Sequence, residues 1–244
     1  MKYSDRFAVL NSVFTPGGDI CLPEAKIDVK YFSFKSNGFD AGHKETSIYS
    51  NDIIISENLK FRYPVFVPRG TGKPDKAILL FHGLNERSWN KYLSWAEYLC
   101  EHIGKPVILF PIAFHINRSP KSWSDPRSML SLLNLRRKKY SNDRSVSLAN
   151  VALSERLSNN PLLFYTSGKQ TFHDLETLCT DIRAGMHPLF APNTQIDLFA
   201  YSIGAFLAQI LLLANPGKLF SKSRLFLFCG GSIFSAMQGV SRSL

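Results

Sequence analysis

From residue 76 onward, short continuous apolar runs alternate with longer stretches of helical periodicity, and this alternation constrains the fold more than any other feature of the chain. Runs that are short and apolar throughout are typical of strands covered on both faces. The apolar runs span residues 76–81, 106–110 and 223–229, and a further strand is predicted at 194–200. Helix-like segments at 89–103 and 203–214 lie between them. Strands separated by helices predict right-handed crossovers and a parallel sheet with helices on both faces.

The N-terminal part of the chain has a different pattern. Residues 25–35 alternate apolar and polar side chains, which predicts a strand with one covered face. Two more strands are predicted at 51–56 and 59–67, and Pro64 suggests that the second is an edge strand or is bent. We therefore expect an α/β fold: a mostly parallel, doubly wound sheet with N-terminal antiparallel edge strands, formed by residues 1–244 as a single domain.

Residues 116–170 interrupt the alternation of strands and helices. They are rich in Ser, Asn, Arg and Lys, and they contain helix-like stretches at 126–139 and 145–157. We interpret residues 116–170, the cap segment, as a cap or lid inserted into the sheet fold. A capping-box pattern at 171–174 predicts that the next helix begins there and runs to about residue 186.

Composition narrows the class of protein. Hydrophobic residues make up 45% of the chain and charged residues 20%, as in ordinary soluble domains. The most apolar stretch, 205–214, is too short to span a bilayer, so no membrane association is expected. The cysteine spacings of 79, 79 and 50 residues match no zinc or redox motif, which predicts no metal and no cofactor. Cys100, Cys179 and Cys229 lie in apolar patterns and are expected to be buried free thiols, which favours a reducing, cytoplasmic location.

The net charge of +10 is concentrated in two segments. Residues 115–145 hold eight Lys or Arg and two Asp, a net +6, and residues 217–244 hold four Lys or Arg and no acid. The run 136–139 is Arg-Arg-Lys-Lys. A solvated helix face is the favoured interpretation, because no aromatic residues interleave the run, and nucleic-acid binding is not expected. The alternative is a basic insert that binds an anionic partner.

Ser202 lies at the junction of a predicted strand and a predicted helix, within Phe199-Ala200-Tyr201-Ser202-Ile203-Gly204-Ala205. This setting is typical of a nucleophile elbow, the sharp turn that exposes a catalytic serine. A serine hydroxyl is a weak nucleophile until a general base takes its proton. Between residues 198 and 244, however, the chain contains no Asp, Glu or His.

In these features the chain resembles a bacterial-type branch of the α/β-hydrolase superfamily. The resemblance covers roughly residues 45–235 and is carried by His82-Gly83-Leu84 after an early strand and by the small-x-Ser-x-Gly elbow around Ser202. Ala200 stands where the family has glycine, which is a mild departure because alanine is also small.

The resemblance implies a serine hydrolase that acts on a small-molecule ester, thioester or amide through an acyl-enzyme. Ser202 is then the nucleophile, and the backbone N–H groups of Leu84 and Ile203 form the oxyanion hole. His82, Gly83 and Gly204 give structural support. The family places its acid and histidine on later strands, so we expect a C-terminally truncated domain that lacks the last strands and is inactive by itself.

Three further expectations complete this interpretation. An upstream base remains open, with His115, Asp125 and His173 as candidates, whereas His102 and His187 are expected at the surface. The strand 223–229 is expected to leave one sheet edge exposed, which favours self-association. The alternative function is a non-catalytic binding module on the same scaffold, with the basic insert facing an anionic partner.

Overall fold

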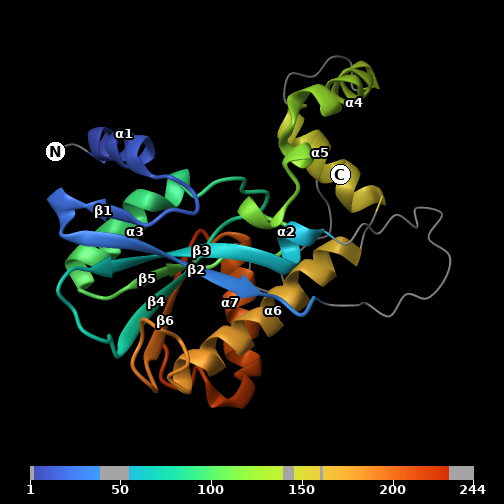
Figure 1. Cartoon of the computed structure of the whole chain (residues 1–244). Helices are drawn as coiled ribbons and strands as arrows, with labels where there is room; N and C mark the ends of the chain where they lie inside the picture. The colour runs from blue at the N-terminus through green and yellow to red at the C-terminus, as the bar shows by residue number, and fades with distance from the viewer. Residues whose placement is uncertain (1–2, 39–54, 140–145, 160–161, 231–244) are drawn as a thin grey trace.

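The computed structural model describes residues 3–38, 55–139, 146–159 and 162–230 (Figure 1). Its centre is a seven-stranded sheet with the strand order β1-β2-β3-β5-β4-β6-β7. The strands are β1 (Ile20–Leu22), β2 (Ile27–Lys35), β3 (Lys60–Pro68), β4 (Lys76–Phe81), β5 (Val107–Leu109), β6 (Gln195–Tyr201) and β7 (Leu225–Phe228). The expected α/β fold is confirmed.

The sheet is mixed rather than mostly parallel. β4 pairs in parallel with β5 and β6, and β6 pairs in parallel with β7. The pairs β1–β2, β2–β3 and β3–β5 are antiparallel, so the described sheet has three parallel and three antiparallel strand pairs. The expected N-terminal antiparallel strands are confirmed. The parallel share is smaller than expected because β1, which the sequence did not predict, adds one antiparallel pair.

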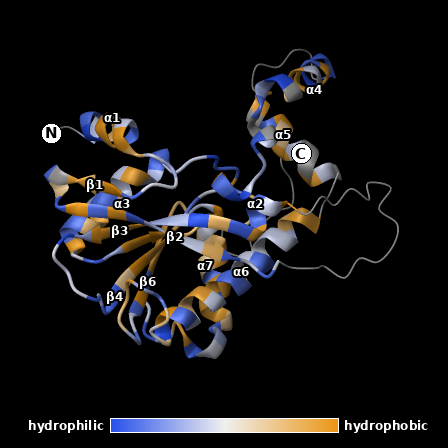
Figure 2. Ribbon diagram, in the orientation of Figure 1, coloured by the Kyte–Doolittle hydropathy of each residue, from blue (hydrophilic) through white to orange (hydrophobic). Residues whose placement is uncertain are grey.

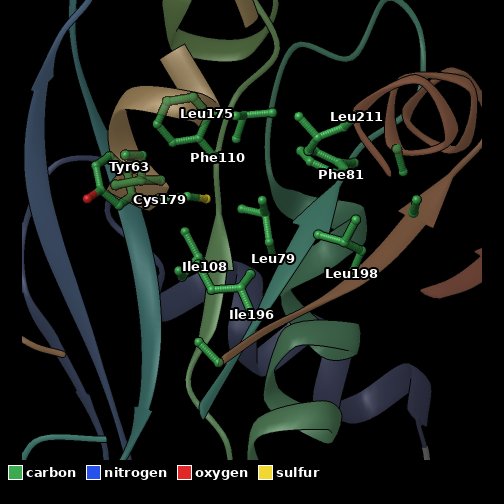
Figure 3. Close-up of a cluster of buried hydrophobic side chains, with 14 of the residues drawn as sticks. Tyr63, Leu79, Phe81, Ile108, Phe110, Leu175, Cys179, Ile196, Leu198 and Leu211 are labelled. Atoms are coloured by element: carbon green, nitrogen blue, oxygen red, sulfur yellow. The ribbon is translucent and has the colours of Figure 1, made fainter. Parts of the chain in front are cut away.

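Helices cover both faces of the sheet (Figure 1). On one face lie α1 (Tyr3–Val13) and α3 (Asn90–Ile103), which Arg6 joins by an ion pair with Glu97. On the other lie α6 (Leu162–Arg183) and α7 (Ile203–Ala214). Each face has its own apolar core. Figure 3 shows the core beneath α6 and α7, where strand side chains such as Leu79 and Leu198 lie near Cys179 and Leu211.

The burial pattern of β6 explains how one strand serves both cores. Ile196, Leu198 and Ala200 are buried in the core under α6 and α7, whereas Phe199 and Tyr201 pack into the core under α3. Successive side chains of a strand point to opposite faces, so the run 198–201, where both faces are covered, has apolar and aromatic side chains on both sides. Figure 2 shows the same tendency, with apolar colour concentrated on the central strands.

The cap segment contains η2 (Ile116–Arg118), η3 (Lys121–Ser124), α4 (Pro126–Lys139), α5 (Leu148–Asn159) and the first turns of α6. α4 packs on α5 away from the sheet (Figure 1). The predicted helix start at 171–174 is wrong, because α6 begins at Leu162. The Thr171 hydroxyl accepts a hydrogen bond from Ala113 N–H at 2.9 Å and donates to Ser167 O at 2.7 Å, so Thr171 anchors the middle of the helix rather than capping its start.

Several smaller expectations have mixed outcomes. Residues 51–54 lie outside the described residues, and Ser56, assigned to the same strand, begins the short helix α2 (Ser56–Leu59). Cys100 and Cys179 are buried as expected, but Cys229 is exposed, because it follows β7, which lies at the edge of the sheet formed by the described residues. The sequence patterns did not predict α1, β1, η1 (Pro23–Ala25) or η4 (Pro216–Lys218). None of the helices within the described ranges is long and apolar enough to cross a membrane.

Candidate functional site

Ser202 is the single residue between β6 and α7, where the sequence predicts a sharp turn. Its backbone has φ 55° and ψ −120°, a region that L-amino acids rarely adopt. Such strain costs on the order of 1–3 kcal/mol and persists only where the surroundings enforce it. Here the Ser202 N–H donates to Phe228 O at 3.1 Å, and its hydroxyl makes no capping bond to α7. The hydroxyl is therefore not used to stabilise the helix start.

The first turn of α7 lies against the end of β4. A Cβ added at Gly204 would lie 2.6 Å from Phe81 Cβ and 2.7 Å from His82 O, so glycine is needed there for steric reasons. Phe81 pairs in register with Ala200, two residues before the turn. The two glycine-containing motifs, 120 residues apart in the sequence, are therefore direct neighbours in the fold.

His82 links the ends of two strands. Its side chain is buried, and its ring nitrogens lie 2.8 Å from Gly83 O and 2.9 Å from Ile112 N. Because Ile112 N–H is a donor, Nε2 accepts and Nδ1 carries the proton. Burial, and then the nearby His115, hold the pKa of His82 well below its usual value, so the ring is neutral.

Gly83 follows in a loop with little space for a side chain. Its N–H donates to the Tyr92 hydroxyl at 2.8 Å, and that hydroxyl donates in turn to Glu86 at 2.8 Å. A Cβ at Gly83 would lie 2.9 Å from the ring of Tyr201. The loop after β4 is thus hydrogen-bonded to α3 and lies close to the strand that precedes Ser202.

Two backbone N–H groups remain unpaired where these loops meet. Within the described part of the chain, neither Leu84 N–H nor Ile203 N–H donates a hydrogen bond to a protein acceptor. The Ile203 N–H is the first of α7, and the first N–H groups of a helix have no partner inside it. Both residues line a hollow of about 550 Å³ between the strand ends, the cap segment and α7.

Of the histidines in the described ranges, His115 lines this hollow as well, and its Nδ1 lies 2.9 Å from Ala113 O. His173 lies elsewhere, exposed on α6 and 3.5 Å from Glu176. His102 is exposed, as expected. The surface position expected for His187 is wrong: it is buried, its Nε2 lies 2.9 Å from the Tyr63 hydroxyl, and burial lowers its pKa to about 4.

Asp125, the third candidate base, lies at the start of α4. Its Oδ1 accepts a hydrogen bond from the Arg127 N–H at 3.0 Å, which is the geometry of a helix cap. Of the three upstream candidates, the structure thus brings His115 to the hollow, whereas Asp125 and His173 are not among the residues that line it.

A buried ion pair that the sequence analysis missed holds the wall of the hollow after β5. Arg118 is fully buried, and its guanidinium donates to Asp174 of α6 at 2.7 Å and to Pro111 O at 3.1 Å. Asn58 Oδ1 accepts from Arg118 Nε at 3.0 Å, and Ser36 Oγ lies 2.6 Å from the same Asp174 carboxyl. Burial lowers the pKa of Arg118 to about 10, which leaves it charged at neutral pH.

Two other features bear on the expected chemistry. In the described part of the chain, no group of three or more His, Cys, Asp or Glu side chains is placed to hold a metal ion. The basic run of α4 is partly engaged inside the cap segment, since Arg136 donates to Ser154 Oγ at 2.6 Å and Arg137 donates to Val146 O at 3.2 Å.

Comparisons with solved structures return esterases at low sequence identity. A cold-adapted esterase from an Arctic intertidal metagenomic library is 12% identical, with a TM-score of 0.42 over 87% of this chain and 65% of that one. A mutant of the esterase rPPE is 11% identical, with a TM-score of 0.43 over 92% and 48%. A putative acetyl xylan esterase from Bacteroides fragilis is 10% identical, with a TM-score of 0.39 over 86% and 48%. The chain thus spans 48% to 65% of the length of these structures.

Sequence comparison adds the family. No curated protein matches the chain. One family model, described as a family of unknown function (DUF6051), matches residues 1–244. The chain therefore belongs to the DUF6051 family.

Proposed function

We propose that this fold carries a serine hydrolase site, with Ser202 as the nucleophile that attacks an ester, thioester or amide carbonyl. The observation that carries the proposal is the strained backbone of Ser202, at φ 55° and ψ −120°, in a one-residue turn between β6 and α7. Strain of this kind clusters at active sites because it presents a side chain that a regular element would not expose.

The oxyanion hole belongs to the same proposal. The unpaired N–H groups of Leu84 and Ile203 are donors fixed before reaction, and they lie in the two segments that Gly204 brings into contact. Such donors stabilise the negative charge that develops on a carbonyl oxygen, typically by about 2.7–4 kcal/mol each. The N-terminal dipole of α7 adds to their effect. His82 and Gly83 act as structural support in this scheme, through their bonds to Ile112 and Tyr92.

His115 is the base candidate that this geometry favours, because it lines the same hollow as Leu84 and Ile203. When Nδ1 of His115 carries the proton and donates it to Ala113 O, Nε2 carries the lone pair that a general base needs. The strand order supports the resemblance to α/β-hydrolases as well, since β5 lies outside β4 and the serine-bearing β6 follows on its other side.

The test is covalent labelling with a fluorophosphonate, located by mass spectrometry of peptides. With His115 as the base, the 244-residue chain is expected to be labelled at Ser202, in contrast to the inactivity that the lack of an acid or histidine after Ser202 predicts. Ser202→Ala is expected to lose the label. Ser119→Ala is the matched control, since Ser119 lines the same hollow and its hydroxyl is engaged with Ile116 O at 2.9 Å. Labelling that persists in Ser202→Ala contradicts the assignment of the nucleophile. His115→Gln is expected to slow the labelling at least tenfold, and an unchanged rate contradicts its role as base.

The alternative of a binding module for an anionic partner has a weaker structural basis. Arg118 is neutralised by Asp174, and two residues of the basic run bond within the cap segment. Nucleic-acid binding, where it occurs, weakens steeply between about 50 and 200 mM salt. The absence of retention on a nucleic-acid column at low salt removes this alternative.

A further inference from the structure

The hollow is lined by Ile203, the residue after Ser202, while Ser202 itself is not among the lining residues. Much of its wall is apolar. α5 contributes Leu153 and Leu157, the first turn of α6 contributes Leu163, and α7 contributes Phe206 and Ile210. The volume of about 550 Å³ falls in the range of pockets that enclose small organic ligands. The cap segment and α7 together thus form a chamber for a ligand with substantial apolar surface.

Several polar groups that line the hollow are already engaged with the protein. Glu86 bonds Lys91 and Tyr92, Ser167 donates to Ala113 O at 2.8 Å, and Ser119 donates to Ile116 O. The hydroxyl protons of Ser119 and Ser167 are thus used within the protein, so these groups offer a ligand only acceptor lone pairs. The unpaired Leu84 and Ile203 N–H groups lie at the strand-end side of the hollow. The chamber therefore combines these donors with a mostly apolar lining, to which Lys169 of α6 adds a charged side chain.

We propose that this chamber binds the aliphatic chain of a medium-chain acyl ester, with the carbonyl at the Leu84 and Ile203 end and the chain directed toward α5. The position of the carbonyl rests on the proposed function. The binding of the chain does not, because it depends only on apolar surface removed from water. The affinity for an alkyl chain and the reactivity of Ser202 are therefore measured separately.

The first measurement is the dissociation constant of straight-chain 1-alkanols from four to ten carbons, determined by isothermal titration calorimetry on the 244-residue chain. Burying a methylene favours binding by up to about fourfold per carbon, so affinity is expected to rise stepwise with length. The rise is expected to stop when the chamber is full. Ser202→Ala is expected to show the same series. Affinity that does not depend on chain length overturns the proposal.

Filling the chamber gives the matched test. Leu153→Trp, from α5, is expected to weaken 1-octanol binding at least tenfold and to leave 1-butanol within about twofold. Leu130→Trp is the control, because Leu130 lies on α4 of the same cap segment, is exposed and does not line the hollow. Ile210→Trp fills the chamber from α7 and serves if Leu153→Trp does not fold. Octanol binding that is unchanged in both filling variants overturns the proposal.

The two proposals fail in distinguishable ways. Length-dependent alkanol binding without fluorophosphonate labelling removes the proposed function and leaves the chain-binding chamber. Labelling at Ser202 at equal rates with ethyl and octyl fluorophosphonates, together with length-independent alkanol binding, leaves the hydrolase and removes the chamber.

Discussion

Replacement of Gly204 by alanine is the sharpest test of the turn that presents Ser202. The new Cβ would lie 2.6 Å from Phe81 Cβ and 2.7 Å from His82 O, whereas carbon atoms in favourable contact are about 3.5–4.0 Å apart. Both atoms are fixed directly to the backbone of the β4 end, so no side-chain rotation relieves the overlap. α7 or the end of β4 must move instead.

The expected cost is about 1–3 kcal/mol of unfolding free energy, the range found for overpacked cores. This cost outweighs the gain of up to about 1 kcal/mol from replacing glycine by alanine in a helix. For a chain of this size, 1 kcal/mol corresponds to about 2–4 °C in Tm. The assay is thermal unfolding followed by circular dichroism, with fluorophosphonate labelling of the same sample, which is expected to slow as the turn shifts.

Gly168→Ala is the matched control for Gly204→Ala. Gly168 lies in α6, and a Cβ there would meet no atom within 4 Å. The control is expected to raise stability by up to about 1 kcal/mol. The two substitutions are chemically identical and are expected to have opposite signs. A Gly204→Ala variant as stable as the wild type, alongside a stabilised Gly168→Ala, refutes the close approach of α7 to β4.

Three other predictions concern stability and association. Arg118→Leu leaves the Asp174 carboxyl buried without its cation and is expected to lower the free energy of unfolding in urea by about 3–5 kcal/mol. Adding Asp174→Asn is expected to restore part of this loss, and an unchanged urea midpoint in Arg118→Leu contradicts the prediction. Burial lowers the folded-state pKa values of His82 and His187, so the unfolded chain binds more protons than the folded chain below about pH 6.5. The free energy of unfolding is therefore expected to decrease as the pH is lowered from about 6.5 to 4, by at most about 1.4 kcal/mol per pH unit for each histidine. A urea midpoint that stays constant from pH 7 to 5 contradicts this. Phe226 is 57% exposed on β7, at the edge of the described sheet. Phe226→Lys is therefore expected to increase the fraction of monomer measured by light scattering at tens of micromolar protein. A wild-type protein that is already monomeric at this concentration contradicts the expected self-association.

The turn at Ser202 was predictable because all of its determinants are local. An apolar run, a small residue at 200, a glycine at 204 and a helical pattern lie within about ten residues of one another. The chain order of strands and helices after residue 76 was predictable for the same reason. What these local patterns did not specify is which strand of the parallel half pairs with β3, since pairing between distant strands depends on the packing of the whole sheet.

The support of the site was not predictable, because it depends on contacts between distant residues. Arg118 lies in a segment rich in Ser and Lys, where an arginine ordinarily faces solvent. Its partner Asp174 is 56 residues away, and Ser36, which contacts the same carboxyl, is 138 residues from it. The position of His187 was not predictable for the same reason. The proline that follows it suggested a place at the surface, but its ring packs against Phe32 and hydrogen-bonds with the Tyr63 hydroxyl.

The two sides of the hollow are held by different kinds of interaction, and this bears on how the proposed site selects a substrate. The loop from 111 to 118 is fixed by directional bonds to α6, including those of Arg118 to Asp174 and of Ala113 to Ser167 and Thr171. Fully satisfied buried polar networks specify a single geometry. The opposite wall is apolar, and in the described structure α4 supports α5 from the side away from the sheet. Apolar surfaces tolerate changes of shape when volume is kept. A site built in this way holds the reacting group in one position and adapts to the alkyl chain attached to it. Substitutions in α5 are therefore expected to change the chain-length preference without changing the labelling of Ser202 by ethyl fluorophosphonate, whereas disruption of the Arg118 network is expected to change both.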